Sequence, residues 1–106
     1  MPQVSPADLP DDALVLDVRE QDEWDEGHAP QAVHIPLSQL VERLGELPHV
    51  DGTLPVTCKA GGRSAQAVTW LAQQGYDVAN VDGGMMAWAA ASKPMVADGG
   101  SAPRVK

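Results

Sequence analysis

The sequence has 106 residues, of which 43% are hydrophobic and 21% charged, a balance typical of a globular protein rather than a disordered one. This length suits one domain, because two cores of ordinary size need a longer chain. A formal net charge of −8 argues against nucleic acid and anionic membranes as general partners, since both require clustered lysine and arginine. No apolar run approaches the roughly 20 residues of a membrane span, so we expect no membrane partner.

The chain contains one cysteine, Cys58, and three histidines. A single cysteine forms neither an internal disulfide nor a cysteine-rich zinc site, and it suits a reducing compartment. The start of the chain also lacks a basic region followed by an apolar segment, so we predict a soluble, unexported, cytoplasmic protein. The histidines lack the spacing of metal ligands, and no metal site is predicted.

The first half of the chain alternates between predicted strands and helical segments. A helical turn is predicted over residues 5–9, where a capping serine precedes a proline. The apolar run 13–18 predicts a central strand that is covered on both faces. The polar segment 19–30 predicts a loop with a helical turn, and a short strand follows at 32–35. Apolar residues spaced by three and four predict a helix over 37–47 that covers the sheet.

The second half continues the alternation, with strands predicted at 54–58 and 78–81 and helices at 64–74 and 85–91. Strands separated by helices normally pair in parallel, with helices on both faces of the sheet. The sequence therefore predicts an α/β fold whose ligands bind at the carboxyl ends of the strands.

The chain after Ser92 is rich in small residues and has no apolar period. We predict a single domain over residues 1–92 and a flexible tail over 93–106.

The segment between Cys58 and the following helix carries two glycines and two of the seven basic residues. Glycines permit a tight curl that turns amides inward, and the first turn of a helix adds partial positive charge. These amides and the two cations lower the pKa of the thiol, so Cys58 is predicted to be a catalytic nucleophile. The predicted substrate-binding residues are Lys59, Ala60, Gly61, Gly62 and Arg63.

Charged residues follow the first predicted strand. Asp17, Arg19 and Glu20 predict an ion-paired network that fixes the next loop and supports the site structurally.

Three ordered motifs resemble the signatures of the rhodanese family, and they span most of the chain. The resemblance implies a central parallel five-stranded sheet flanked by helices, transfer of sulfane sulfur, and a persulfide on the loop cysteine. The motifs are Asp17-Val18-Arg19-Glu20 with Gly27-His28-Ala29-Pro30 and His34-Ile35-Pro36, then Cys58 to Ser64, then Gly83-Gly84 with Trp88.

The predicted activity is that of a thiosulfate:cyanide sulfurtransferase. The Cys58 thiolate takes sulfur from a small anionic donor such as thiosulfate, while Lys59 and Arg63 hold its oxyanion end. Cyanide, a small thiol or an acceptor protein then removes the sulfur. No metal or organic cofactor is needed, because amides and cations accommodate the transferred charge.

Two alternatives remain at this point. A partner-specific persulfide relay or a binding module would use the same loop without free turnover. A cysteine phosphatase or arsenate reductase would place five residues between cysteine and arginine, whereas four separate Cys58 from Arg63. The tighter loop makes this second alternative less favourable.

Overall fold

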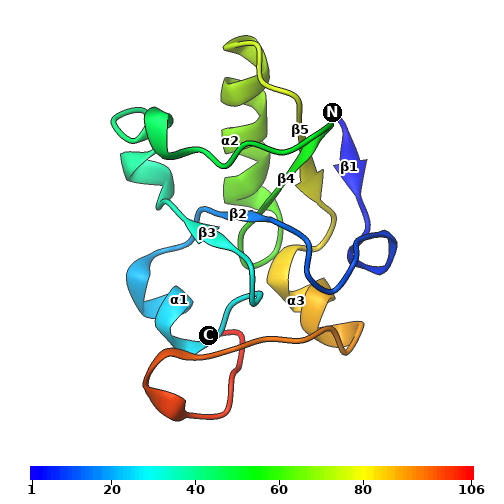
Figure 1. The fold of residues 1–106 in the computed structure, drawn as a ribbon, viewed down its shortest axis with the longest axis vertical. Coiled ribbons are helices and arrows are strands. Elements are labelled where there is room, and N and C mark those ends of the chain that lie inside the picture. Colours follow the sequence, from blue (N-terminus) through cyan, green and yellow to red (C-terminus); the bar gives the residue numbers. More distant parts are fainter.

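Five short strands form one sheet in the computed structural model, which describes residues 1–106 (Figure 1). Their spatial order is β1-β5-β4-β2-β3, and all neighbouring pairs are parallel. This arrangement confirms the predicted α/β fold with a central parallel five-stranded sheet. The strands are β1 (Gln3–Val4), β2 (Leu16–Asp17), β3 (Val33–His34), β4 (Leu54–Thr57) and β5 (Val78–Val81).

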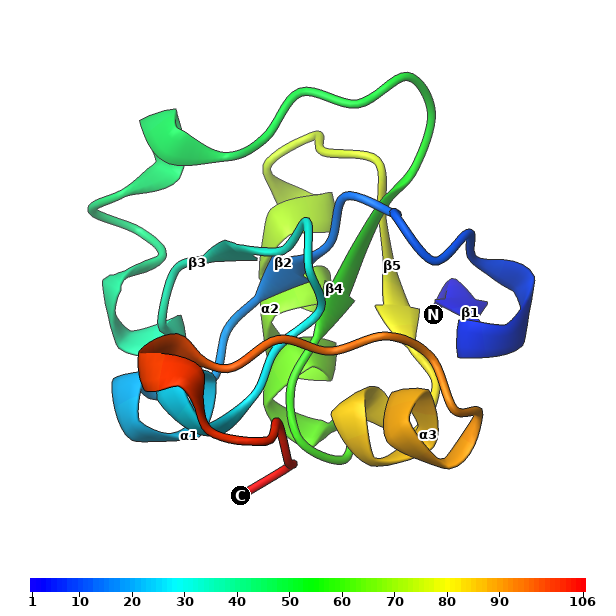
Figure 2. The same ribbon diagram turned by 60° about the horizontal axis from the view of Figure 1, so that its bottom comes forward.

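Three α-helices and four short 3₁₀ turns complete the fold, and none is long and apolar enough to cross a membrane. In Figure 2, α2 lies behind β4 and α3 lies near the end of β5. The α-helices are α1 (Gln21–Glu26), α2 (Gly62–Gln73) and α3 (Gly84–Ala90). The 3₁₀ turns are η1 (Pro6–Asp8), η2 (Leu37–Gln39), η3 (Leu44–Glu46) and η4 (Asp98–Gly100).

The sheet separates two hydrophobic cores, and neighbouring residues of one strand segment belong to different cores. Leu16 is fully buried in the larger core, together with Val68 of α2. Val15 is buried in the smaller core, together with Met85 and Trp88 of α3. Because successive side chains of a strand point to opposite faces, a sheet with helices on both sides requires apolar residues at consecutive positions. This explains the continuous apolar run of the first predicted strand.

The predicted helix over residues 37–47 is wrong. The segment forms the two 3₁₀ turns η2 and η3, and Arg43 between them has φ −107° and ψ 22°, outside the α-helical region. Leu40 and Leu47 still reach the larger core, but Val41 is 66% exposed. A glycine at position 45 weakens an α-helix, and short turns bring the leucines to the sheet without one.

Strand β1 was not predicted. Gln3 and Val4 pair with Asn80 and Val81 at the edge of the sheet. Two residues are too few to show a strand period, so only tertiary pairing identifies this element.

The segment after Ser92 runs from α3 back across α1 (Figure 2). Val96 and His28 form an antiparallel bridge with two backbone hydrogen bonds of 2.9 Å. The Arg104 amide donates to the Glu26 carbonyl at 2.8 Å, and a Cβ on Gly27 would lie 2.5 Å from the Arg104 carbonyl oxygen. The domain boundary after residue 92 and the flexibility of residues 93–106 stay predictions.

Candidate active site

The candidate active site is the loop between β4 and α2, at the carboxyl edge of the sheet. Cys58 follows β4 directly, and α2 begins four residues later at Gly62. Gly61 has φ +109°, a left-handed conformation that residues with a side chain rarely adopt, and it lets the backbone curl around the sulfur. The structure thus places Cys58 to Gly61 in the loop, and Gly62 and Arg63 in the first turn of α2.

Hydrogen-bond donors surround the sulfur of Cys58. The Gly61 amide donates to Sγ at 3.1 Å, and the Ser64 hydroxyl oxygen lies 3.3 Å from Sγ. Burial raises the pKa of the Cys58 thiol, but hydrogen bonds from the Ser64 hydroxyl and from the amides of Ser64, Gly61 and Ala60 outweigh burial and lower it overall. The loop therefore favours a thiolate, mainly through hydrogen bonds rather than through its two cations.

This lowered pKa predicts the pH dependence of alkylation of Cys58. Iodoacetamide reacts with the thiolate, so the rate rises with pH and levels off once the thiol has ionised. We expect the half-maximal rate at a lower pH than for free cysteine, whose pKa is about 8.5. The alkylation reaction is quenched at intervals, and intact mass spectrometry of the samples gives the rate at each pH. Free cysteine provides the control. A profile displaced to higher pH than that of free cysteine would contradict the hydrogen-bond argument.

The first turn of α3 binds the backbone of the cysteine loop through hydrogen bonds. The Met85 amide donates to the Cys58 carbonyl at 2.8 Å, and the Met86 amide donates to the Lys59 carbonyl at 3.0 Å. Gly84 has φ +58°, and a Cβ there would lie 2.5 Å from the Cys58 carbonyl oxygen. Gly84, the second glycine of the pair noted in the sequence, therefore lets the helix approach the loop backbone.

Gly84→Ala is expected to destabilise the protein by at least about 2 kcal/mol, because the new methyl group meets fixed backbone atoms in a left-handed conformation. Urea unfolding measures this loss. Gly45→Ala provides the matched control, because a Cβ on Gly45 meets no atom within 4 Å. Equal stability of the two variants would mean that α3 does not constrain the loop.

Arg63 forms a two-point ion pair with Glu23 of α1. Its Nη1 and Nη2 atoms lie 2.6 and 2.9 Å from the two carboxylate oxygens of Glu23. Hydrogen bonds from Arg63 lower the pKa of Glu23, and the same contacts raise the pKa of Arg63. Glu23 was missed in the sequence, because no local pattern relates residues 40 positions apart. The pair fixes Arg63 beside the loop and uses two of its five N–H donors.

The predicted support residues Asp17 and Arg19 form a fully buried ion pair, with Nη2 2.7 Å from Oδ2. The Arg19 guanidinium also donates to the Gly27 carbonyl at 2.7 Å, which connects the end of β2 to the end of α1. Glu20 takes no part in this pair. Its amide instead donates to the Glu23 carboxylate at 3.1 Å at the start of α1.

Two histidines pack against one tryptophan beside this pair. The Trp24 indole stacks on His28 and His34, with ring centroids 3.6 and 4.7 Å away. The His28 imidazole also forms a hydrogen bond with the Trp24 carbonyl, and the His34 imidazole forms one with the Arg19 carbonyl. These histidines hold the segment around α1 together.

Asn80 of β5 is a second polar residue that was missed. Only 5% of it is exposed, and its amide nitrogen donates to the Gly61 carbonyl at 3.2 Å. A polar residue inside an otherwise apolar strand was the signal available, since such a side chain needs a buried partner.

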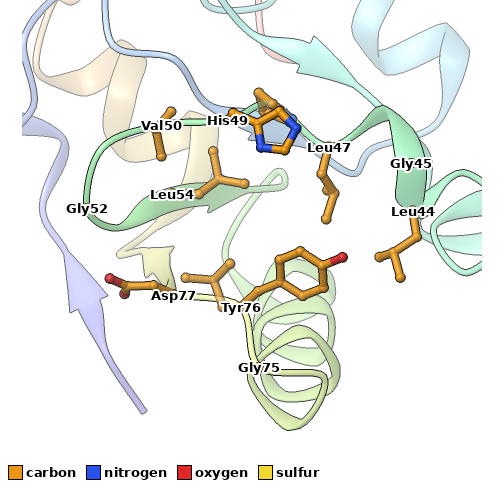
Figure 3. Close-up of a pocket in the computed structure, with 12 residues that line it drawn as sticks. Leu44, Gly45, Leu47, His49, Val50, Gly52, Leu54, Gly75, Tyr76 and Asp77 are labelled. Atoms are coloured by element: carbon orange, nitrogen blue, oxygen red, sulfur yellow. The ribbon is translucent and has the colours of Figure 1, made fainter.

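The one pocket in the structure lies at the other end of the sheet. It has a volume of about 420 Å³ and is lined by residues at the amino ends of β4 and β5, among them Leu54 and Val78 (Figure 3). Leu47 and Tyr76 face its interior. Cys58 does not line it, so the candidate site is a loop rather than a deep cavity.

Comparison with known proteins identifies the family. The model of the rhodanese-like domain matches residues 6–91, and this chain belongs to that family. YtwF of Bacillus subtilis, provisionally named a sulfurtransferase, is 39% identical over 84 residues, which are 79% of this chain and 81% of that protein. A sulfurtransferase of Allochromatium vinosum is 38% identical over 91 residues, or 85% and 84% of the two chains. At the level of the family, the function is sulfur transfer.

Two further comparisons extend this result. YrkF of Bacillus subtilis, provisionally named a sulfur carrier protein, is 40% identical over 75 residues, which are 70% of this chain and 40% of that protein. The crystal structure of a rhodanese-related protein from Thermoplasma volcanium has 33% identity and a TM-score of 0.81, covering 91% of this chain and 98% of that one. The fold is therefore rhodanese-like.

Proposed function

We propose that this protein moves a sulfane sulfur from a small anionic donor, such as thiosulfate, through a persulfide on Cys58 to a thiophilic acceptor. The observation that carries the proposal is the set of hydrogen bonds around Sγ, which lowers the pKa of the Cys58 thiol. A thiolate is the form of cysteine that attacks sulfur. A lone cysteine that must stay reduced also fits a reducing compartment such as the cytoplasm.

The first half-reaction is a displacement at sulfur. The Cys58 thiolate attacks the outer sulfur of thiosulfate, a bond forms between the two sulfurs, and the S–S bond of thiosulfate breaks. Its electron pair leaves with sulfite, so no separate oxidant is needed. Amides of the loop then stabilise the negative outer sulfur of the persulfide.

The second half-reaction returns the enzyme to its starting form. The carbon of cyanide, or the sulfur of a thiol, attacks the outer sulfur and takes it away. The bond to Sγ breaks, and its electron pair restores the Cys58 thiolate. Because sulfite leaves before the acceptor reacts, ping-pong kinetics are expected.

The loop limits which donors can react. Cys58 is only 1% exposed, so a donor must present sulfur at a narrow tip while the rest of the molecule stays outside. Lys59 is exposed and supplies positive charge for the oxyanion end of such a donor. Arg63 adds a guanidinium beside the same loop, where the Glu23 carboxylate holds it in place and offsets part of its charge. The amides of Ala60, Gly61 and Gly62 complete the proposed binding loop.

Intact mass spectrometry tests this proposal directly. After incubation with thiosulfate, the protein is expected to gain about 32 Da, the mass of one sulfur atom, and to lose it again with cyanide. A parallel sample with 3-mercaptopyruvate identifies the preferred donor. Absence of any gain with either donor would contradict the persulfide proposal.

A sulfur relay is the second candidate, because the relative YrkF carries a sulfur-carrier name. A relay would form the same persulfide but discharge it only to a particular acceptor protein. The rate of sulfur loss to cyanide or a small thiol distinguishes the two candidates, since an enzyme turns over freely. No observation favours the phosphatase or arsenate reductase alternative.

A further inference from the structure

The hydroxyl group of Ser64 has one hydrogen and two neighbouring acceptors. Ser64 is fully buried, and its Oγ lies 2.5 Å from Oδ1 of Asn80 and 3.3 Å from Sγ of Cys58. A hydroxyl donates only one hydrogen bond at a time. The two acceptors therefore compete for it.

The orientation of the Asn80 amide is fixed by its other partner. Its nitrogen faces the Gly61 carbonyl at 3.2 Å, and a carbonyl only accepts hydrogen bonds. A flipped amide would place two oxygen atoms against each other, and the amide nitrogen beside the Ser64 hydroxyl. Oδ1 of Asn80 thus faces the Ser64 hydroxyl and is an acceptor for its hydrogen.

We propose that Asn80 is a positioning residue that competes with Cys58 for the Ser64 hydroxyl hydrogen and thereby sets how readily the thiol ionises. In the thiol form, S–H donates to Ser64 Oγ and the Ser64 hydroxyl donates to Asn80. When the thiol ionises, the hydroxyl turns to Sγ, and Oδ1 of Asn80 loses its partner in a buried place. Losing this buried hydrogen bond raises the free energy of the thiolate form but not that of the thiol form.

The consequence for sulfur transfer rests on the proposed function. A thiolate with a very low pKa is abundant but weakly nucleophilic, and the best attacking thiol has a pKa near the ambient pH. Asn80 accepts a hydrogen bond from the Ser64 hydroxyl, and this competition limits how far the loop lowers the pKa of Cys58. The Asn80 side chain makes no hydrogen bond to Sγ, so it acts through Ser64.

Other charged groups lie around the loop, and replacing Asn80 removes none of them. They are Lys59 and Arg63 on the loop and its helix, Glu23 on α1, and the Asp17–Arg19 pair at the end of β2. Asn80 makes hydrogen bonds to none of them; its side chain bonds only Ser64 and Gly61. A change in the pKa of Cys58 on replacing Asn80 therefore reports on the Ser64 contact.

The test measures the pKa of Cys58 from thiolate absorbance and from the pH profile of alkylation. Four proteins are compared: wild type, Asn80→Ala, Ser64→Ala and the double variant. Asn80→Ala is expected to lower the pKa by about half to one unit, the value of one hydrogen bond. In the Ser64→Ala background the same replacement should leave the pKa unchanged, because no hydroxyl remains to be released.

Folding is controlled by circular dichroism and thermal unfolding. The Gly61 carbonyl keeps a bond from the Ala65 amide at 3.0 Å, so the loop retains an anchor without Asn80. Asn80→Val, which suits a strand, repeats the test if the alanine variant does not fold. An unchanged or raised pKa in Asn80→Ala, or an equal shift with and without Ser64, would overturn the proposal. These readouts do not depend on sulfur transfer, so they separate this inference from the proposed function.

Discussion

Cys58→Ser is expected to reduce thiosulfate:cyanide turnover by at least about a thousandfold while the protein stays folded. A serine hydroxyl remains protonated at neutral pH and forms no persulfide, so both half-reactions lose their carrier. The side chains are similar in size, and a serine oxygen can accept the Gly61 hydrogen bond that Sγ accepts at 3.1 Å. Steady-state production of thiocyanate measures the loss.

Two further variants complete this experiment. Cys58→Ala should be as inactive as Cys58→Ser, because neither has a thiolate. Thr69→Ala is the control: its exposed hydroxyl bonds only the Ala65 carbonyl on α2, so turnover should be kept. Retained turnover in Cys58→Ser, with an unchanged unfolding midpoint, would show that sulfur does not pass through Cys58.

Arg19→Met is expected to lower the free energy of unfolding by about 3–5 kcal/mol, because it leaves the fully buried Asp17 carboxylate without its partner. The substitution also removes the bond to the Gly27 carbonyl, which holds α1 to the end of β2. Since Glu23 of α1 fixes Arg63, we also expect slower sulfur transfer by the protein that remains folded. Urea unfolding and turnover at low temperature measure the two effects.

Arg43→Met is the matched control for this prediction, because Arg43 and its partner Glu46 are 32% and 56% exposed. Its unfolding midpoint should hardly change, since water solvates both groups when they separate. A double variant, Asp17→Asn with Arg19→Met, should recover part of the lost stability by removing the stranded charge. If Arg19→Met were as stable as wild type, the buried pair would not support the site.

The features that could be predicted from the sequence depend on local pattern. Consecutive apolar residues in the first strand follow from burial on both faces, and this predicted the parallel sheet. Glycine, cysteine and two cations within one short segment predicted the cysteine loop, because turn geometry and charge act between neighbours in the chain. The helix predicted over 37–47 failed for a related reason: its spacing is also compatible with 3₁₀ turns, and only packing against the sheet selects between them.

Local pattern along the chain was enough to predict the fold class, the position of Cys58 at the carboxyl end of a strand, and the loop that surrounds it. Which distant polar groups meet at that loop depends on tertiary packing. Glu23 reaches Arg63 across 40 positions, and Asn80 reaches Ser64 across 16. Periodicity in a sequence records burial and backbone conformation, whereas a hydrogen bond between distant residues depends on how the elements pack in space.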